Sequence, residues 1–242
     1  MLTTLCLDFG NTRLKGCIID DSGITAVFVL DNDPLHQLGE IITTHKPAFS
    51  IMSSVIPLEP GIEELLHRTT HFHKLSSASH LAFTVPVGKP ETVGADRLAI
   101  AAATVELFPA QNNLSIALGT CITYNFINCS NQLIGGSISP GMGMRFKSLQ
   151  HNTAALPLVS ATWNVPLVGY DTVSNIQSGV VLGMACELDG MINLYKKRYS
   201  KFNVVLTGGD LPFLAPHIKN EIFADPDLIF KGLYAISKIN HA

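Results

Sequence analysis

Two short glycine turns, each placed directly after an apolar run, carry the residue types suited to binding phosphate. The first spans residues 8–12 (DFGNT) and the second residues 118–120 (LGT). A glycine at a strand end permits a sharp turn whose backbone N–H groups point outward, and a following threonine adds a hydroxyl donor. Because a carboxylate repels phosphate, Asp8 is expected to hold a hydrated Mg²⁺ that bridges to phosphate oxygens. A plain hairpin turn explains either motif alone, but the pair favours a clamp for nucleotide phosphates.

A candidate for acid–base chemistry stands at the start of a predicted helix. Asp96 and Arg97 fall in the first turn of a helix expected over residues 94–108. The helix dipole favours the ionised form of Asp96, so this carboxylate is expected to be a weak base, adequate for accepting a proton late in phosphoryl transfer. Arg97 offers forked donors for a polar substrate group. The alternative is a surface carboxylate beside a solvent-facing arginine.

The elements around the two turns repeat. The first half is expected to contain strands and helices in the order strands 3–9, 13–20 and 24–30, helix 34–45, strand 48–53, helix 60–68, strand 72–75 and helix 94–108. The second half restarts with strands 114–118, 121–128 and 132–138, a long helix 172–197, strand 203–206 and two short helical stretches. This repeat predicts an α/β fold of two related domains, 1–110 and 111–242, with mixed sheets flanked by helices.

Composition favours an enzyme of the cytoplasm. The 242 residues are 47% hydrophobic and 14% charged, enough for one long domain or two half-size domains. A net charge of -3 without a basic stripe makes nucleic acid an unexpected partner. The five cysteines form no CxxC pair and are expected to be reduced, and no apolar run approaches the roughly 18 residues of a membrane helix. A cytoplasmic location without membrane association is therefore expected.

Five motifs in this order resemble the type III pantothenate kinase family. They are DFGNTRLK at 8–15, GADR at 94–97, LGT at 118–120, GGSISPG at 135–141 and TGGD at 207–210. The resemblance implies an actin-like ATPase fold of two ribonuclease-H-like domains and a homodimer. It also implies transfer of a phosphoryl group from ATP, with Mg²⁺, to pantothenate, the first step of coenzyme A synthesis.

The resemblance also assigns roles residue by residue. It implies that the first phosphate loop consists of Asp8, Phe9, Gly10, Asn11, Thr12, Arg13, Leu14 and Lys15. It implies that Thr120 contacts ATP from the second turn and that Asp96 is the catalytic base. Pantothenate binding is implied for Gly94, Ala95, Asp96, Arg97 and Thr172.

Three positions depart from the family pattern. The family usually has an aspartate where Ala117 stands, and this aspartate binds a monovalent cation, K⁺ or NH₄⁺. Asn125 replaces a second usual aspartate, and Val87 replaces a substrate-side aromatic residue. These changes leave open a nucleotide-binding regulatory protein without turnover, or a kinase of another small hydroxylated substrate. The retained Asp8, Asp96 and Arg97 favour turnover.

Overall fold

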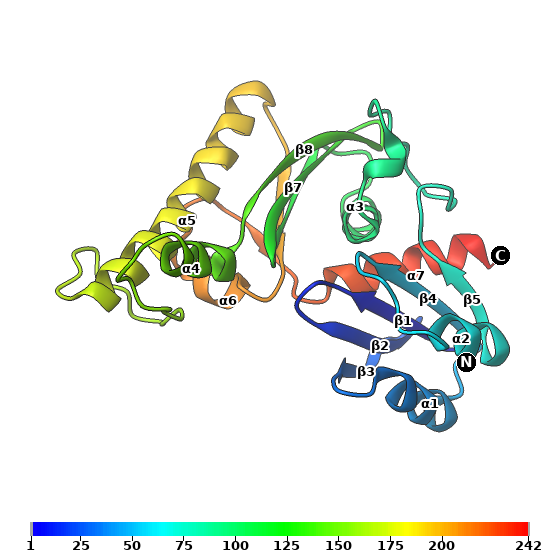
Figure 1. The fold of residues 1–242 in the computed structure, drawn as a ribbon. Coiled ribbons are helices and arrows are strands. Elements are labelled where there is room, and N and C mark those ends of the chain that lie inside the picture. The colour runs from blue at the N-terminus through cyan, green and yellow to red at the C-terminus, as the bar shows by residue number, and fades with distance from the viewer. Residues whose placement is uncertain (1, 242) are drawn as a thin grey trace. The chain divides into compact units, whose positions relative to one another are not determined.

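The computed structural model describes residues 2–241 and contains two five-stranded mixed sheets of the same topology (Figure 1). The strand order is β3-β2-β1-β4-β5 in one sheet and β8-β7-β6-β9-β10 in the other. In both sheets the central strand pairs antiparallel with the strand that follows it and parallel with a strand later in the chain. The duplication expected from the two glycine turns is therefore confirmed.

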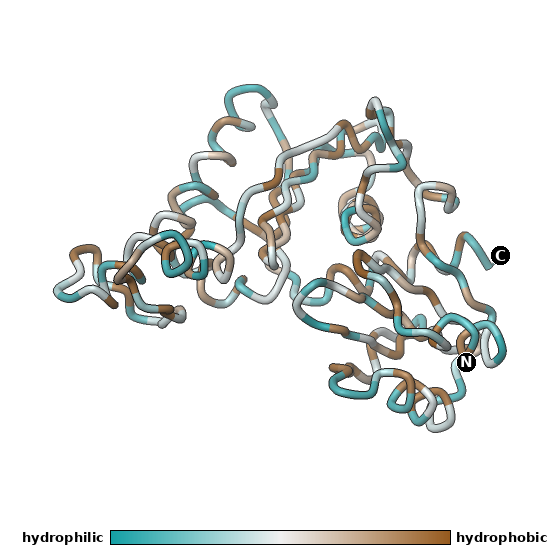
Figure 2. Tube along the Cα trace, viewed as in Figure 1, coloured by the Kyte–Doolittle hydropathy of each residue, from teal (hydrophilic) through white to brown (hydrophobic). Residues whose placement is uncertain are grey.

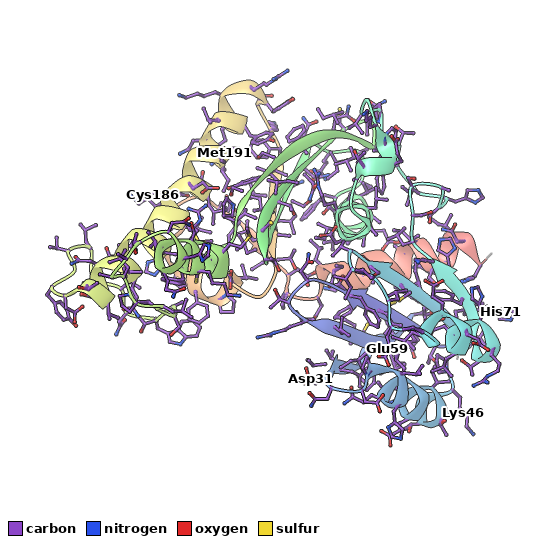
Figure 3. All side chains as sticks on the ribbon, in the orientation of Figure 1. Asp31, Lys46, Glu59, His71, Cys186 and Met191 are labelled. Atoms are coloured by element: carbon purple, nitrogen blue, oxygen red, sulfur yellow. The ribbon has the colours of Figure 1, made fainter. Side chains whose placement is uncertain are left out.

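The first compact unit comprises the chain up to Ala110, residues 130–134 and the segment from Asp227 onward. Its strands are β1 (Thr4–Phe9), β2 (Leu14–Asp20), β3 (Gly23–Leu30), β4 (Phe49–Ser54) and β5 (His71–Lys74). Its α-helices are α1 (Pro34–His45), α2 (Ile62–Thr69), α3 (Ala95–Leu107) and α7 (Leu228–Asn240), with a short 3₁₀ turn at Pro90–Thr92. In Figure 3, His71 marks the start of the edge strand β5.

Strand alternation divides β1 between two environments. Leu5, Leu7 and Phe9 pack in one cluster with buried residues of α1 and α2. Cys6 and Asp8 point to the opposite face, because successive side chains of a strand alternate. Figure 1 shows α7 lying against that opposite face, with α3 packed on α7. The alternation thus directs Asp8 toward the layer that contains α3.

Two segments lie outside the domain division expected from the sequence. The helix α7 belongs to the first unit, because it packs on α3, β1 and β4. Its Gly232 lies so close to Ala99 of α3 that a Cβ would overlap the Ala99 carbonyl oxygen. Residues 130–134 also group with the first unit, since Thr84 exchanges backbone hydrogen bonds with Asn131 and Leu133. The first compact unit is therefore discontinuous in sequence.

The second compact unit comprises Gln111–Cys129 and Gly135–Pro226. Its strands are β6 (Asn113–Leu118), β7 (Cys121–Asn128), β9 (Asn203–Thr207), β10 (Phe223–Ala224) and, from Gly135 onward, β8 (Gln132–Pro140). Its helices are α4 (Met142–His151), α5 (Thr172–Arg198), α6 (Leu211–Leu214) and a 3₁₀ turn at Ala215–His217. The sequence analysis did not predict α4.

The long helix α5 is defined at both ends by local chemistry. Asp171 is its N-cap and accepts a hydrogen bond from the Ser174 backbone N–H at 2.7 Å, while the Ser174 side chain bonds back to the backbone of Asp171. This capping box stabilises the first turn. Three basic residues in the last turn complement the helix C-terminus. One side of α5 packs on β6, β7 and β9, forming the core of the second unit.

Candidate functional site

The first glycine turn joins β1 to β2 and carries the sequence-predicted phosphate loop. The Gly10 N–H donates to the Arg13 carbonyl oxygen at 3.1 Å and closes the turn. Asn11, Thr12 and Arg13 are exposed at its tip. The strand register pairs Asp8 with Lys15 and Phe9 with Leu14, so residues 8–15 form one compact hairpin end.

Asp8 has an unusual acidity for an aspartate. Burial is the main cause that raises its pKa, the negative charge of Asp96 raises it further, and the charge of Lys15 lowers it. The net effect raises the pKa of Asp8 to about 7. Asp8 and Asp96 therefore lie close enough to interact electrostatically, although they are far apart in the sequence. The two carboxylates are close because the Asp8 side chain points to the face of β1 on which the layer containing α3 lies.

The GADR segment opens α3, as the sequence predicts. Gly94 is the N-cap residue and its carbonyl oxygen accepts the first helical hydrogen bond from Leu98 N–H at 3.1 Å. A Cβ on Gly94 would overlap the carboxylate of Asp96, so glycine at this position leaves room for that side chain. Ala95, Asp96 and Arg97 form the first turn and are partly exposed. The segment therefore presents a carboxylate and a guanidinium at a helix start.

The expected acidity of Asp96 was wrong in direction. Burial raises the pKa of Asp96 above its ordinary value, and this effect exceeds the opposing hydrogen bond and charge from Arg97. The sequence analysis considered only the helix N-terminus, which favours the charged form. It could not include desolvation, which comes from elements distant in sequence. The higher pKa makes Asp96 a stronger base than an exposed aspartate.

The second glycine turn is built where three sequence motifs meet in the second unit. Residues 118–120 connect β6 to β7, and Gly119 N–H donates to the Cys121 carbonyl oxygen at 3.1 Å. Gly141, from GGSISPG, donates its N–H to the Thr120 carbonyl oxygen at 3.1 Å. Gly208, from TGGD, has φ +105 and lies against the backbone of Leu118. The sequence identified these motifs separately, and the structure joins them around one turn that leaves Thr120 exposed.

Gly141→Ala is expected to destabilise the protein by about 1–3 kcal/mol. The new Cβ would overlap the carbonyl oxygens of Gly119 and Thr120, so the backbone of the second turn must move. Gly143→Ala is the matched control on α4, because a Cβ there has no neighbour within 4 Å. It should stabilise by about 0.5–1 kcal/mol. Urea unfolding measures both effects, and equal stability of the two variants would contradict the close approach.

Thr172 is the first residue of α5 and is exposed beside a cavity of about 770 Å³ in the second unit. The cavity lies between α4 and α5, and apolar side chains including Leu149, Ile176 and Val180 form part of its wall. Arg145 of α4 also lines it. The sequence analysis missed Arg145. Its signal was the apolar spacing of Met142, Phe146 and Leu149, which is typical of a helix face.

The structure brings the predicted site residues together in two groups. Residues 8–15 and 94–97 belong to the first unit, where Asp8 and Asp96 interact. Thr120 and Thr172 belong to the second unit. Across residues 2–241, no cluster of three or more His, Cys, Asp or Glu side chains could hold a metal ion alone. No helix in this part of the chain is long and apolar enough to cross a membrane.

The donor set around Asp8 nevertheless fits Mg²⁺. This ion keeps several water ligands and commonly binds through one or two carboxylates together with substrate phosphates. Two neighbouring carboxylates with raised pKa values form an acidic pair that the adjacent cation Lys15 does not fully compensate. A divalent cation would neutralise the remaining negative charge of this acidic pair. At the monovalent-cation positions, Ala117 faces Thr123 across β6 and β7, and the buried Asn125 faces Ser115, so neither supplies a carboxylate.

Two sheets of identical strand order, each ending its central strand in a glycine turn, define a protein of the actin-like fold class. Glucokinase from an Antarctic psychrotroph has this fold, with a TM-score of 0.52, 10% identity and coverage of 99% of both chains. A Campylobacter jejuni protein described as a Baf family transcriptional activator is also similar in fold, with a TM-score of 0.60, 22% identity and coverage of 98% of both chains.

Sequence comparison narrows the class to one family. The sequence profile described as type III pantothenate kinase matches residues 4–194. The type III pantothenate kinase of Flavobacterium johnsoniae is 36% identical over 231 residues, which cover 95% of each chain. This chain belongs to the type III pantothenate kinase family.

Proposed function

We propose that this protein transfers the γ-phosphoryl group of ATP to the primary hydroxyl of pantothenate, the first step of coenzyme A synthesis. Family membership over nearly the whole chain supports this substrate. The observation that carries the chemistry is the acidic pair: Asp8 at the end of β1 and Asp96 at the start of α3 interact electrostatically. Such a pair suits a kinase, in which one carboxylate serves the metal and the other the attacking hydroxyl.

The first phosphate loop would bind and orient ATP. The exposed tip of the hairpin presents backbone and Thr12 donors to phosphate oxygens, with Lys15 and Arg13 contributing positive charge. Thr120 would contact ATP from the second turn, whose backbone is supported by Gly141 and Gly208. Asp8 would hold Mg²⁺, which when bound neutralises charge on the transferred phosphoryl group.

Asp96 would accept the proton of the attacking hydroxyl through its carboxylate oxygen. Phosphoryl transfer has a loose transition state, so the proton moves late and a moderately basic carboxylate is sufficient. Burial raises the pKa of Asp96, which increases its basicity. Gly94, Ala95 and Arg97 would contact pantothenate from the same helix start. The family resemblance implies a role in substrate binding for Thr172 as well, at the start of α5.

A coupled assay of ADP release tests this function. With MgATP and pantothenate, turnover at about 1–100 s⁻¹ is expected, the usual range of kinases. Measurable ATP binding without ADP release would instead favour a regulatory nucleotide-binding protein. ADP release that requires another small alcohol would favour a kinase of a different substrate. Mass spectrometry of the product, expected to be 4'-phosphopantothenate, separates these outcomes.

We further propose that turnover does not require a monovalent cation. Ala117 carries no carboxylate, and the amide of Asn125 has no negative charge to offer. The same assay in potassium chloride and in tetramethylammonium chloride, at equal ionic strength, should give equal rates. A rate that rises with K⁺ or NH₄⁺ would indicate that backbone carbonyl oxygens take over the site.

A homodimer is also proposed, and an apolar segment before α5 supports it. Leu167, Val168 and Tyr170 are between 80% and 85% exposed. Figure 2 shows hydrophobic stretches along this segment, which is irregular between α4 and α5. Adjacent exposed apolar side chains mark protein contact surfaces. Light scattering after gel filtration should give twice the mass of one chain.

A cytoplasmic location stays a prediction from the sequence.

A further inference from the structure

The peptide group between Pro140 and Gly141 makes a hydrogen bond at each of its two ends. Its N–H, which belongs to Gly141, donates to the Thr120 carbonyl oxygen in the second glycine turn at 3.1 Å. Its carbonyl oxygen, which belongs to Pro140, accepts from Nε of Arg145 at 2.9 Å. A peptide group is planar and rigid, so its two ends cannot move independently. The position of the Arg145 guanidinium therefore acts directly on the backbone of the second turn.

The guanidinium of Arg145 is itself held by the long helix α5. Its Nη2 donates to the carboxylate of Glu187. The two side chains are only 24% and 26% exposed, so water competes little for this ion pair. Figure 1 shows α4, the helix that carries Arg145, beside α5, and the two helices are in contact. The ion pair thus connects α5 to the peptide group that holds the second turn.

Glu187 is a fixed anchor for this ion pair. Its carboxylate also accepts hydrogen bonds from the hydroxyls of Ser139 in β8 and Tyr124 in β7. Burial raises the pKa of Glu187, but these hydrogen bonds and the charge of Arg145 lower it below its ordinary value, so Glu187 is ionised. A charged acceptor with three donors has little freedom to rotate. Two strands and α5 therefore determine the orientation of the Arg145 side chain.

We propose that Arg145 is a positioning residue, which fixes the second glycine turn so that Thr120 binds ATP. The proposal rests on the proposed function, because it takes the contact between Thr120 and ATP from there. A cation that donates to the Pro140 carbonyl oxygen polarises the peptide group and strengthens the hydrogen bond from the Gly141 N–H. Arg145 acts through this bond and does not contact ATP. Its loss should therefore weaken ATP binding and leave pantothenate binding unchanged.

Arg145→Met, assayed by steady-state kinetics, tests the proposal. Methionine keeps an unbranched apolar stem and removes every donor of the guanidinium. The KM for ATP should rise by about three- to tenfold, the effect of one hydrogen bond, with kcat and the KM for pantothenate nearly unchanged. Arg145→Lys, which restores one charged donor but not the fork, should recover part of the loss. An unchanged KM for ATP in Arg145→Met would overturn the proposal.

A double variant separates the positioning role from the cost of an unpaired carboxylate. Arg145→Met leaves Glu187 half-buried without its cation, which is destabilising. Arg145→Met/Glu187→Gln removes that charge, and it should melt near the wild-type Tm while retaining the raised KM for ATP. A return of this KM to the wild-type value would refute the proposal. Lys147→Met is the matched control, because Lys147 is an exposed cation on the same helix, and its KM values should stay unchanged.

Amide hydrogen exchange gives a readout that needs no turnover. The Gly141 N–H should exchange about three- to tenfold faster in Arg145→Met, while the amides of β6 keep their protection. Equally faster exchange throughout β6 would show that Arg145 only stabilises the second unit, and the proposal would be wrong. Faster exchange at Gly141 with weaker ATP binding by calorimetry, in a protein that releases no ADP, would support the proposal and contradict the proposed function. Normal ADP release with unchanged ATP affinity in the variant would do the reverse.

Discussion

Asp96→Asn is expected to lower kcat by about 10²- to 10⁴-fold, the usual contribution of a general base. The amide has nearly the same shape as the carboxylate but cannot accept the proton of the attacking hydroxyl. ATP affinity should change much less, because Asp96 is assigned to the acceptor substrate and not to the nucleotide. Steady-state kinetics with MgATP and pantothenate measure both quantities.

The pH profile gives this prediction a second readout. Burial raises the pKa of Asp96, so the wild-type kcat/KM should fall on the acid side at a pH above the ordinary aspartate value of 3.8. The acid limb should disappear from the residual activity of Asp96→Asn. Glu106→Gln, a change to an exposed carboxylate in the last turn of α3, should retain both activity and the limb. Wild-type turnover in a folded Asp96→Asn protein would refute the base assignment.

Asp8→Asn is expected to abolish most turnover and yet make the metal-free protein more stable at pH 8. The folded state holds the proton of Asp8 up to pH about 7, whereas the unfolded chain releases it near 3.8. Between these values the folded state binds more protons, so the free energy of unfolding of the wild type decreases as the pH rises. Above pH 7 the full cost of the charged carboxylate is present, and asparagine removes it.

The size of the stabilisation follows from the pKa values. The gap between 3.8 and about 7 corresponds to roughly 4 kcal/mol, and the partial exposure of Asp8 reduces the expected gain to about 2–3 kcal/mol. Thermal melting at pH 8 in EDTA should therefore show Tm higher by about 5–10 °C. The gain should vanish only below about pH 3, under the ordinary pKa of 3.8, where both states of the wild type are protonated.

Turnover of Asp8→Asn should fall by about 10²-fold or more, because the carboxylate proposed to hold Mg²⁺ is removed. Asp31→Asn is the control, since Asp31 is an exposed carboxylate of the first unit, labelled at its periphery in Figure 3. It should leave stability and turnover unchanged at both pH values. A less stable Asp8→Asn protein at pH 8 would show that burial does not penalise this carboxylate.

Local features of the site were predictable from sequence. The turn at Gly10 and the helix start at Gly94 each depend on residues within four positions of one another. Such short-range rules, glycine at turns and Asp or Ser at helix N-termini, act before tertiary packing. The two sheets were also predictable, because the strand patterns around the two glycine turns repeat.

The helix α4 was missed for a local reason. Its sequence, MGMRFKSLQH, includes Gly143 in the first turn, and only Met142 and Phe146 are buried. A glycine lowers helix propensity, so the apolar spacing alone gave a weak signal. With α4 unrecognised, Arg145 could not be placed on the wall of the cavity between α4 and α5.

By itself the sequence determined the types of residue available for phosphoryl transfer, the two glycine turns and the duplicated order of strands. Only the tertiary structure decided that α7 completes the first unit, that Asp8 lies near Asp96, and that Gly141 and Gly208 both support the second turn. The reason is that desolvation, charge proximity and close backbone approach depend on distances between segments far apart in the chain. Those distances arise only when the strands and helices pack.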